Sequence, residues 1–150
     1  MSQPLEAFLA GCNIIAFQKN DYPYGMCCAW AQMVDTDKIT LLLGSQSTTA
    51  KHINIGDEVG VSALSTGQKA IAWQLGENHS EEMNKLVGIP IQECGSAILI
   101  PGAKVLMICK VLERLVLTSC PNDYLFLFQV ISYRMDTKKA FLSAHKVLDI

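Results

Sequence analysis

Residues 25–53, GMCCAWAQMVDTDKITLLLGSQSTTAKHI, decide more about the fold than any other stretch of the chain. An extended run is followed by a polar turn at residues 35–37, and a second β-rich run extends over residues 39–43. Residues 44–49 then lead into a short helix that we expect over residues 50–54. The stretch therefore predicts two strands and a helix, with turn-forming residues between them.

Small hydroxyl and amide side chains cluster between the second of these strands and the helix: Ser45, Gln46, Ser47, Thr48 and Thr49. A helix start leaves backbone N–H groups unpaired, and hydroxyl groups add donors, so this position suits a phosphate group. Lys51, one turn into the helix, would add a full positive charge. The other interpretation is an ordinary helix cap, because Ser and Thr are favoured there in any case. The residues by themselves favour the cap, and both interpretations stay open.

The length of 150 residues predicts one domain over residues 1–150, large enough to bury a core. Half of the residues are hydrophobic and only 17% are charged, compared with about a quarter in a typical globular protein. We therefore expect some apolar surface to be covered by a second copy, which makes a homodimer. The formal net charge of −2, without a Lys/Arg cluster, argues against a nucleic-acid partner.

Six cysteines without a recognisable signal peptide predict a cytoplasmic protein with free thiols. No apolar run approaches the roughly eighteen residues that span a bilayer, so we expect no membrane association. None of the cysteines forms a CxxC pair and the three histidines are scattered, so no metal site is predicted. Most of the thiols should be buried and behave as small hydrophobic groups.

The rest of the chain alternates apolar strands with short helices. We expect a first helix over residues 5–9, a strand over residues 12–17, a turn at residues 19–25 and a strand over residues 26–34. Further strands are expected over residues 58–64, 97–100, 105–117 and 124–134, and helical pieces over residues 71–75 and 78–87. The last two strands, joined by a short turn, resemble a bent barrel hairpin. The pattern predicts a mainly β protein, a β-barrel with short helices.

Several common catalytic motifs are missing from the sequence. There is no G-x-G-x-x-G fingerprint after a strand and no Walker lysine loop, which excludes a Rossmann nicotinamide domain and a P-loop site. There is no G-x-S-x-G elbow and no C-G-S-C-W signature. An oxidoreductase that uses a bound flavin remains compatible with the sequence.

The order of motifs resembles the flavin reductase-like family, whose members adopt an FMN-binding split β-barrel. Residues 25–30, GMCCAW, resemble the family's N/G-M-x-x-x-W strand beside the flavin, and residues 45–53 resemble its S-x-x-T-x-x-x-I segment at the phosphate. Gln68 with residues 83–86 resembles a Q…D/N-K-F/L stretch, and residues 109–111, CKV, resemble an E-C-K/R-V strand. The resemblance covers nearly the whole chain in order.

This resemblance implies a Greek-key antiparallel split β-barrel that binds FMN near the interface of a homodimer. The cofactor-binding residues that it implies lie in three segments and the C-terminal tail: Cys27, Cys28, Ala29, Trp30, Ser45, Gln46, Ser47, Thr48, Thr49, Lys51, Gln68 and His145. With the resemblance added, a phosphate site at residues 45–51 becomes the preferred interpretation. For Trp30 and His145 the plainer alternatives are a core aromatic residue and a surface histidine.

Two departures from the family pattern concern the chemistry. Cys27-Cys28-Ala29 stands where the family often has Thr-Ala-Ser, so hydroxyl groups near the ring are missing, and the two thiols alternate across the sheet so that at most one faces a ligand. Residues 122–124, NDY, stand where G-D-H is common, so a histidine near the nicotinamide is missing.

The function that the resemblance implies is NAD(P)H-dependent flavin reduction, or reduction of another acceptor through bound FMN. A non-enzymatic FMN-binding electron-transfer protein is the alternative, and a split-barrel module for a different ligand is a third possibility. No catalytic side chain is predicted, because backbone N–H groups of the strand at residues 26–34 and of the loop at residues 65–68 can stabilise the charge that develops on the flavin.

Overall fold

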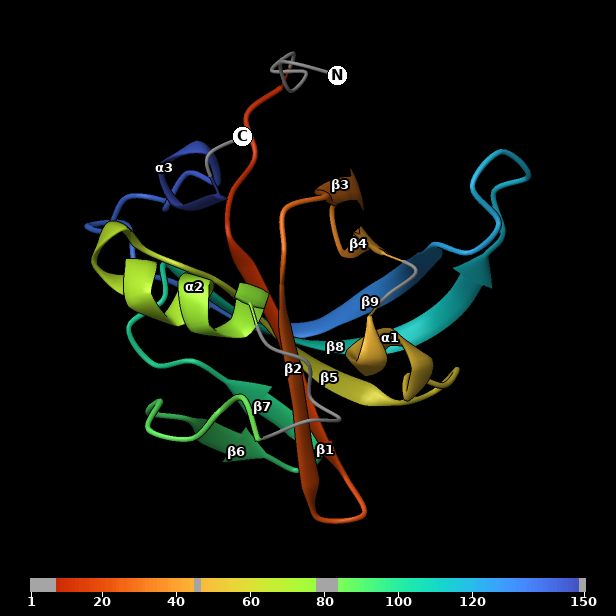
Figure 1. Ribbon diagram of the computed structural model, residues 1–150, viewed down its shortest axis with the longest axis horizontal. Coiled ribbons are helices and arrows are strands. Elements are labelled where there is room, and N and C mark those ends of the chain that lie inside the picture. The colour runs from red at the N-terminus through yellow and green to blue at the C-terminus, as the bar shows by residue number, and fades with distance from the viewer. Residues whose placement is uncertain (1–7, 45–46, 78–83, 149–150) are drawn as a thin grey trace.

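The computed structural model describes residues 8–44, 47–77 and 84–148, and in them the structure is mainly β (Figure 1). Antiparallel pairing joins the strands into one sheet of order β3-β4-β9-β8-β5-β1-β7-β6, with β2 paired to β1. The strands are β1 (Asn13–Lys19), β2 (Tyr22–Cys28), β3 (Ala31–Asp35), β4 (Lys38–Leu43), β5 (Glu58–Ala63), β6 (Gln92–Cys94), β7 (Ala97–Leu99), β8 (Val105–Leu115) and β9 (Tyr124–Met135). The helices are α1 (Thr48–Lys51), η1 (Thr66–Gln68, a 3₁₀ turn), α2 (Lys69–Glu77) and α3 (His145–Leu148). The predicted mainly β class is confirmed.

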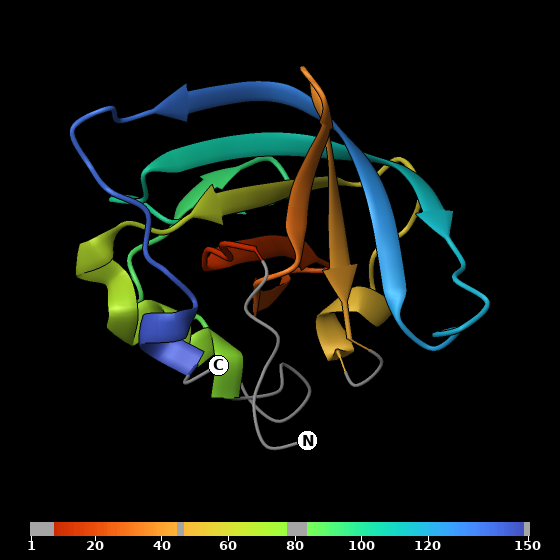
Figure 2. The same ribbon diagram turned by 90° about the horizontal axis from the view of Figure 1, so that it is seen from above.

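The sheet curls into a barrel that carries its helices at two places. Seen from above, β5, β8 and β9 arch over β1, with α2 and α3 together on one side and α1 on the other (Figure 2). The β8–β9 hairpin shifts register between Ile108 and Cys109 and again between Val111 and Glu113. Such irregularities bend a strand and increase its twist, so the bent hairpin expected from the sequence is present.

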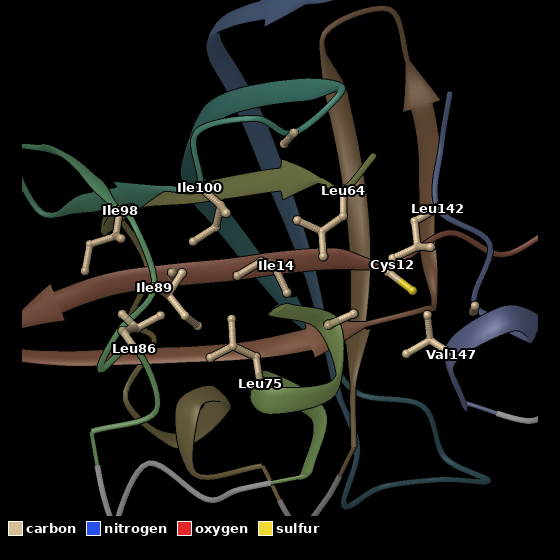
Figure 3. Packing of buried hydrophobic residues seen from close by; sticks show 14 residues of the cluster. Cys12, Ile14, Leu64, Leu75, Leu86, Ile89, Ile98, Ile100, Leu142 and Val147 are labelled. Atoms are coloured by element: carbon tan, nitrogen blue, oxygen red, sulfur yellow. The ribbon is translucent and has the colours of Figure 1, made fainter. Parts of the chain in front are cut away.

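β1 is buried on both faces and separates two hydrophobic clusters. Ile14 and Ala16 belong to the cluster beneath α2 and α3, whereas Ile15 and Phe17 belong to the cluster inside the barrel. Figure 3 shows the first cluster, in which Leu75 of α2 faces Ile14. Because successive side chains of a strand point to opposite faces, a strand with two covered faces must be apolar throughout, as residues 14–17 are.

The prediction of a single strand over residues 26–34 is wrong, because these residues belong to two strands in the structure. β2 ends at Cys28 and β3 begins at Ala31, and β3 pairs with β4 instead of β1. β2 also begins earlier than expected, at Tyr22, since the β1–β2 turn consists only of Asn20 and Asp21. Both turn residues have positive φ, 53° and 62°, as a two-residue hairpin of type I′ requires.

The helices differ from expectation at their ends. α1 begins two residues earlier than predicted, because the Ser47 side chain caps it by accepting a hydrogen bond from the backbone N–H of Ala50 at 2.9 Å. The helix ends at Lys51. Of the helix expected over residues 5–9, residues 1–7 lie outside the described part and residues 8–9 are not helical. Of the one expected over residues 78–87, residues 78–83 lie outside it and residues 84–87 form no helix. α3 and β6 were not expected.

Lys85 is an unusual member of the interior. The residue is only 5% exposed, and no ion pair between the described residues involves it. Burial disfavours the charged ammonium and lowers the pKa of Lys85 to about 8, against a smaller opposing effect of Cys27. A buried amine of this kind costs stability whenever it is protonated.

We predict that Gly60→Ala lowers the free energy of unfolding by at least about 2 kcal/mol, measured by urea denaturation. A Cβ at Gly60 would overlap the backbone carbonyl of Ile98, so two sheet segments would have to separate. The matched control is Gly67→Ala, where a Cβ meets nothing within 4 Å, and its effect should stay within about 0.5 kcal/mol. Equal effects of the two substitutions would contradict the close approach of β5 and β7.

We predict that Lys85→Met removes a pH dependence of stability. In the unfolded chain Lys85 titrates near 10.5 and in the fold near 8, so between these values the unfolded state binds more protons and the wild type gains stability as pH rises. Below pH 8 the wild type should therefore be less stable than Lys85→Met, by an amount on the order of 2 kcal/mol. Urea denaturation of both proteins at pH 7 and pH 10 measures the effect, and a constant difference would refute it.

Candidate functional site

β2 supplies one wall of the candidate site. The strand pairs with β1 from Tyr22 to Cys28, and no second strand pairing of β2 occurs among the described residues. An edge strand presents backbone N–H and C=O groups to whatever lies beside it, which here includes the start of α1. The strand that the sequence places beside the flavin is therefore an edge strand, as backbone contacts to a ring require.

The start of α1 is attached directly to β2. The hydroxyl of Ser47 accepts the hydrogen bond from Ala50 and lies 2.9 Å from the sulfur of Met26, to which it donates. The N-cap interpretation is thus confirmed for Ser47. The cap occupies the Ser47 hydroxyl and the Ala50 N–H, so a phosphate nearby would depend on the other groups of this turn. Two segments of the predicted site, residues 25–30 and residues 47–51, are brought together.

The remaining residues of this turn differ in exposure. Thr48 and Thr49 are buried, Lys51 is exposed, and Ser45 and Gln46 lie outside the described residues. α1 has four residues and no acidic residue in its first turn. A helix of one turn has little macrodipole, so an anion here would depend on hydroxyl groups, local N–H groups and the Lys51 ammonium.

Cys27 and Cys28 face opposite sides of the sheet, as predicted. Cys28 is buried toward the barrel interior, where its thiol lies 3.3 Å from the carbonyl oxygen of Leu42 and 3.5 Å from that of Trp30. Burial raises the pKa of Cys28 to about 11. Cys27 is half-buried on the α2 side and shares a hydrogen bond with the thiol of Cys12, which together with burial raises its pKa.

Ala29 and Trp30 form the link between β2 and β3. Ala29 packs against the cluster beneath α2. The Trp30 side chain is 59% exposed, so the alternative of a core aromatic residue is wrong. Its backbone carbonyl accepts a hydrogen bond of 2.9 Å from Leu42, which holds the link against β4.

Gln68 and His145 lie farther from the turn at α1. The amide of Gln68 accepts a hydrogen bond from the backbone of Ser65 and donates one to the carbonyl of Pro101, each at 3.0 Å. Gln68 thus holds the loop at residues 65–68 in place. His145 begins α3, which lies beside α2 and on the opposite side of the molecule from α1 (Figures 1 and 2).

One segment near the site carried no predicted site residue. Leu86 comes within 3.4 Å of the position that a Cβ would take at Gly25, so the segment at residues 84–86 covers β2 where the GMCCAW motif begins. Lys85 in this segment interacts electrostatically with Cys27. The only sequence signal was the Asn84-Lys85-Leu86 part of the family resemblance, which does not reveal that the lysine is buried.

An apolar groove of about 510 Å³ opens elsewhere on the barrel. It lies between β3, β4 and the chain near residue 141, and its lining includes Met33, Leu41 and Phe141. None of the described residues predicted to bind the cofactor lines it. Met33 and Phe141 are about half exposed, so the rim is an apolar surface.

The described residues contain no group of three or more His, Cys, Asp or Glu side chains able to hold a metal ion. No helix in the part of the chain that the structure describes is long and apolar enough to cross a bilayer.

Comparisons with known proteins agree with this architecture. The family model for the flavin reductase like domain matches residues 5–146. The fold is similar to that of a Streptomyces globisporus NADH:FAD oxidoreductase (TM-score 0.78, 17% identity, 89% of this chain and 80% of that one). It is also similar to an FMN-binding protein from Thermus thermophilus (0.78, 14%, 91% and 80%) and to flavoredoxin from Methanosarcina acetivorans (0.76, 15%, 99% and 83%).

No protein among the curated sequences compared with the chain matches it. At these low identities the structural similarities show the fold alone, and they confirm the predicted split β-barrel. The family model covers nearly the whole chain, in the region where the GMCCAW strand and the capped turn at Ser47 come together. The chain therefore belongs to the flavin reductase-like family.

Proposed function

We propose that the protein is an FMN-dependent oxidoreductase that accepts hydride from NAD(P)H and passes the electrons to free flavin or another acceptor. The observation that carries this proposal is the contact between Ser47 and Met26, which joins the turn suited to a phosphate to the open edge of β2. A flavin mononucleotide needs both features side by side, a polar site for its phosphate and a strand edge for its ring.

The residues present fit such a group. Two buried threonines and an exposed lysine at a helix start without acidic neighbours suit a dianionic phosphate. Backbone groups at the edge of β2 can donate hydrogen bonds where negative charge develops during reduction. The bound flavin itself supplies the hydride chemistry. The chain's part is to bind and orient it, and this task requires no acid or base side chain.

We also propose that the protein is cytoplasmic and that its predicted partner is a nicotinamide. All six cysteines are free, as is usual in a reducing compartment. Similarity to an NADH:FAD oxidoreductase supports a nicotinamide donor, and similarity to an FMN-binding protein supports FMN. His145 stays a predicted contact to the flavin of a second copy.

We predict that NADH or NADPH bleaches the FMN-loaded protein under anaerobic conditions, measured by visible absorbance. Dithionite added to a second sample is the control that the bound flavin can be reduced. If dithionite bleaches the protein and neither nicotinamide does, the protein is an electron carrier, the alternative that the missing histidine at residues 122–124 favours. A protein that takes up no FMN at all would remove the flavin assignment.

We predict that Thr48→Ala combined with Lys51→Ala weakens FMN binding much more than riboflavin binding. Riboflavin lacks the phosphate, and each lost charge-assisted hydrogen bond should cost roughly 1.5–3 kcal/mol of FMN affinity. Fluorescence titration with both flavins measures the difference. The control is Lys110→Ala, an exposed lysine of β8 that should change neither affinity. Equal losses for FMN and riboflavin would place the phosphate elsewhere.

We predict that the protein sediments as a homodimer at micromolar concentration and that Met33→Glu with Phe141→Glu makes it monomeric. Both residues line the apolar groove and are about half exposed, which suits an interface with a second copy. The control is Ile55→Glu, an equally exposed apolar residue outside the groove. A wild-type monomer with flavin bound would contradict an interface site.

A further inference from the structure

Cys12 and Cys27 are neighbours on one face of the β1–β2 hairpin. Cys27 lies opposite Ile14, and Cys12 lies two residues before Ile14, so both thiols project to the side of the sheet beneath α2. Both belong to or pack against the same hydrophobic cluster. The two side chains are close enough to share a hydrogen bond.

The two thiols differ in access. Cys12 is 1% exposed, and Figure 3 shows its sulfur among the side chains of Leu64, Leu142 and Val147. Cys27 is half-buried, so a small reagent can reach it while Cys12 stays protected. An accessible thiol next to a protected one is the arrangement in which an oxidised cysteine is resolved by its neighbour.

The hydrogen bond between the two thiols determines which sulfur carries negative charge. The hydrogen bond lowers the pKa of Cys12 and raises the pKa of Cys27, so a singly ionised pair holds its negative charge on Cys12 and its proton on Cys27. Lys85 is buried, and its charge interaction with Cys27 raises the pKa of Lys85 against the larger effect of burial. No thiol hydrogen bond contributes to the pKa of the buried Cys28 or Cys109.

We propose that Cys12 and Cys27 form an oxidisable dithiol, which a peroxide converts to an internal disulfide. The Cys27 sulfur passes its proton to Cys12, attacks the peroxide ROOH and breaks the O–O bond. Cys27 becomes a sulfenic acid, and the RO fragment takes a proton from solvent and leaves as ROH. The Cys12 sulfur then attacks the Cys27 sulfur, the S–S bond forms, and the hydroxyl group leaves as water. The two thiols lose two electrons in total, and the peroxide gains them.

Closure of the disulfide brings the two side chains closer together. A disulfide requires a sulfur–sulfur distance of about 2.05 Å, so the two side chains must approach from hydrogen-bonded contact. Cys12 precedes β1 and is not part of the β1–β2 ladder; its backbone is held by hydrogen bonds to Leu142 and Leu64. The disulfide would link Cys12, the residue before β1, to Cys27 of β2. Cys27 lies between Met26, which contacts Ser47 at the start of α1, and Cys28, which contacts Leu42 of β4.

The test is cysteine mapping of the full chain after brief exposure of the reduced, native protein to hydrogen peroxide. Remaining thiols are alkylated in denaturant and the chain is cut with trypsin. We expect a cross-link between the peptide of residues 1–19, which contains Cys12, and the peptide of residues 20–38, which contains Cys27 and Cys28. Cys27→Ser should abolish this cross-link, whereas Cys28→Ser and the matched buried control Cys109→Ser should retain it.

Two results would overturn the proposal: a wild-type protein in which Cys12 and Cys27 remain alkylatable after peroxide treatment, or a cross-link that survives Cys27→Ser. The first result needs no variant, so a folding defect cannot obscure it. The measurement also needs no flavin, and its outcome is independent of the proposed oxidoreductase activity.

Discussion

The burial of β1 on both faces is the constraint on which the rest of the structure depends. Ile15 and Phe17 fill the barrel interior, while Ile14 and Ala16 pack under the helices, so one strand carries two hydrophobic clusters. β1 also pairs with β2, β5 and β7. The barrel cannot close and α2 cannot dock unless this strand stays in register, because a slip by one residue would exchange its two faces.

The candidate site follows from the position of β2 beside this strand. β2 has one edge bound to β1, and the other borders the capped turn at Ser47. The division of the chain after Cys28 matters equally, because it sends β3 to β4 and leaves the end of β2 beside α1. The strand edge and the polar turn thus meet through the hairpin, without any dedicated catalytic side chain.

Residues of the same hairpin connect the site to the proposed dithiol. Cys28 points into the barrel and is held by backbone carbonyl groups, whereas Cys27 points to Cys12 and Lys85. Alternation along one strand therefore separates a structural thiol from a reactive one. The replacement of the family's Thr-Ala by two cysteines is thus two different changes, one on each face of the sheet.

Sequence patterns predicted those elements whose signal is local. The runs at residues 39–43, 58–64 and 124–134 became β4, β5 and β9 with small changes at their ends, because alternation and turn residues act over a few positions. A helix cap among the hydroxyl residues was one of the two interpretations of this turn, since Ser and Thr are favoured at such positions, and the structure places it at Ser47. The break at residues 29–30 was missed, because that stretch contains neither Gly nor Pro and the turn is imposed by pairing of β3 with β4.

The sequence by itself determined the mainly β class and the family, and it predicted the segments of the candidate site, because these depend on local periodicity and ordered short motifs. Only the tertiary structure decided that Lys85 is buried and interacts with Cys27. It also decided that the Gln68 amide forms hydrogen bonds with Ser65 and Pro101, and that Cys12 and Cys27 share a hydrogen bond. These contacts join residues that are in most cases far apart in the chain. Their partners are set by strand register and helix docking, which no short stretch of sequence encodes.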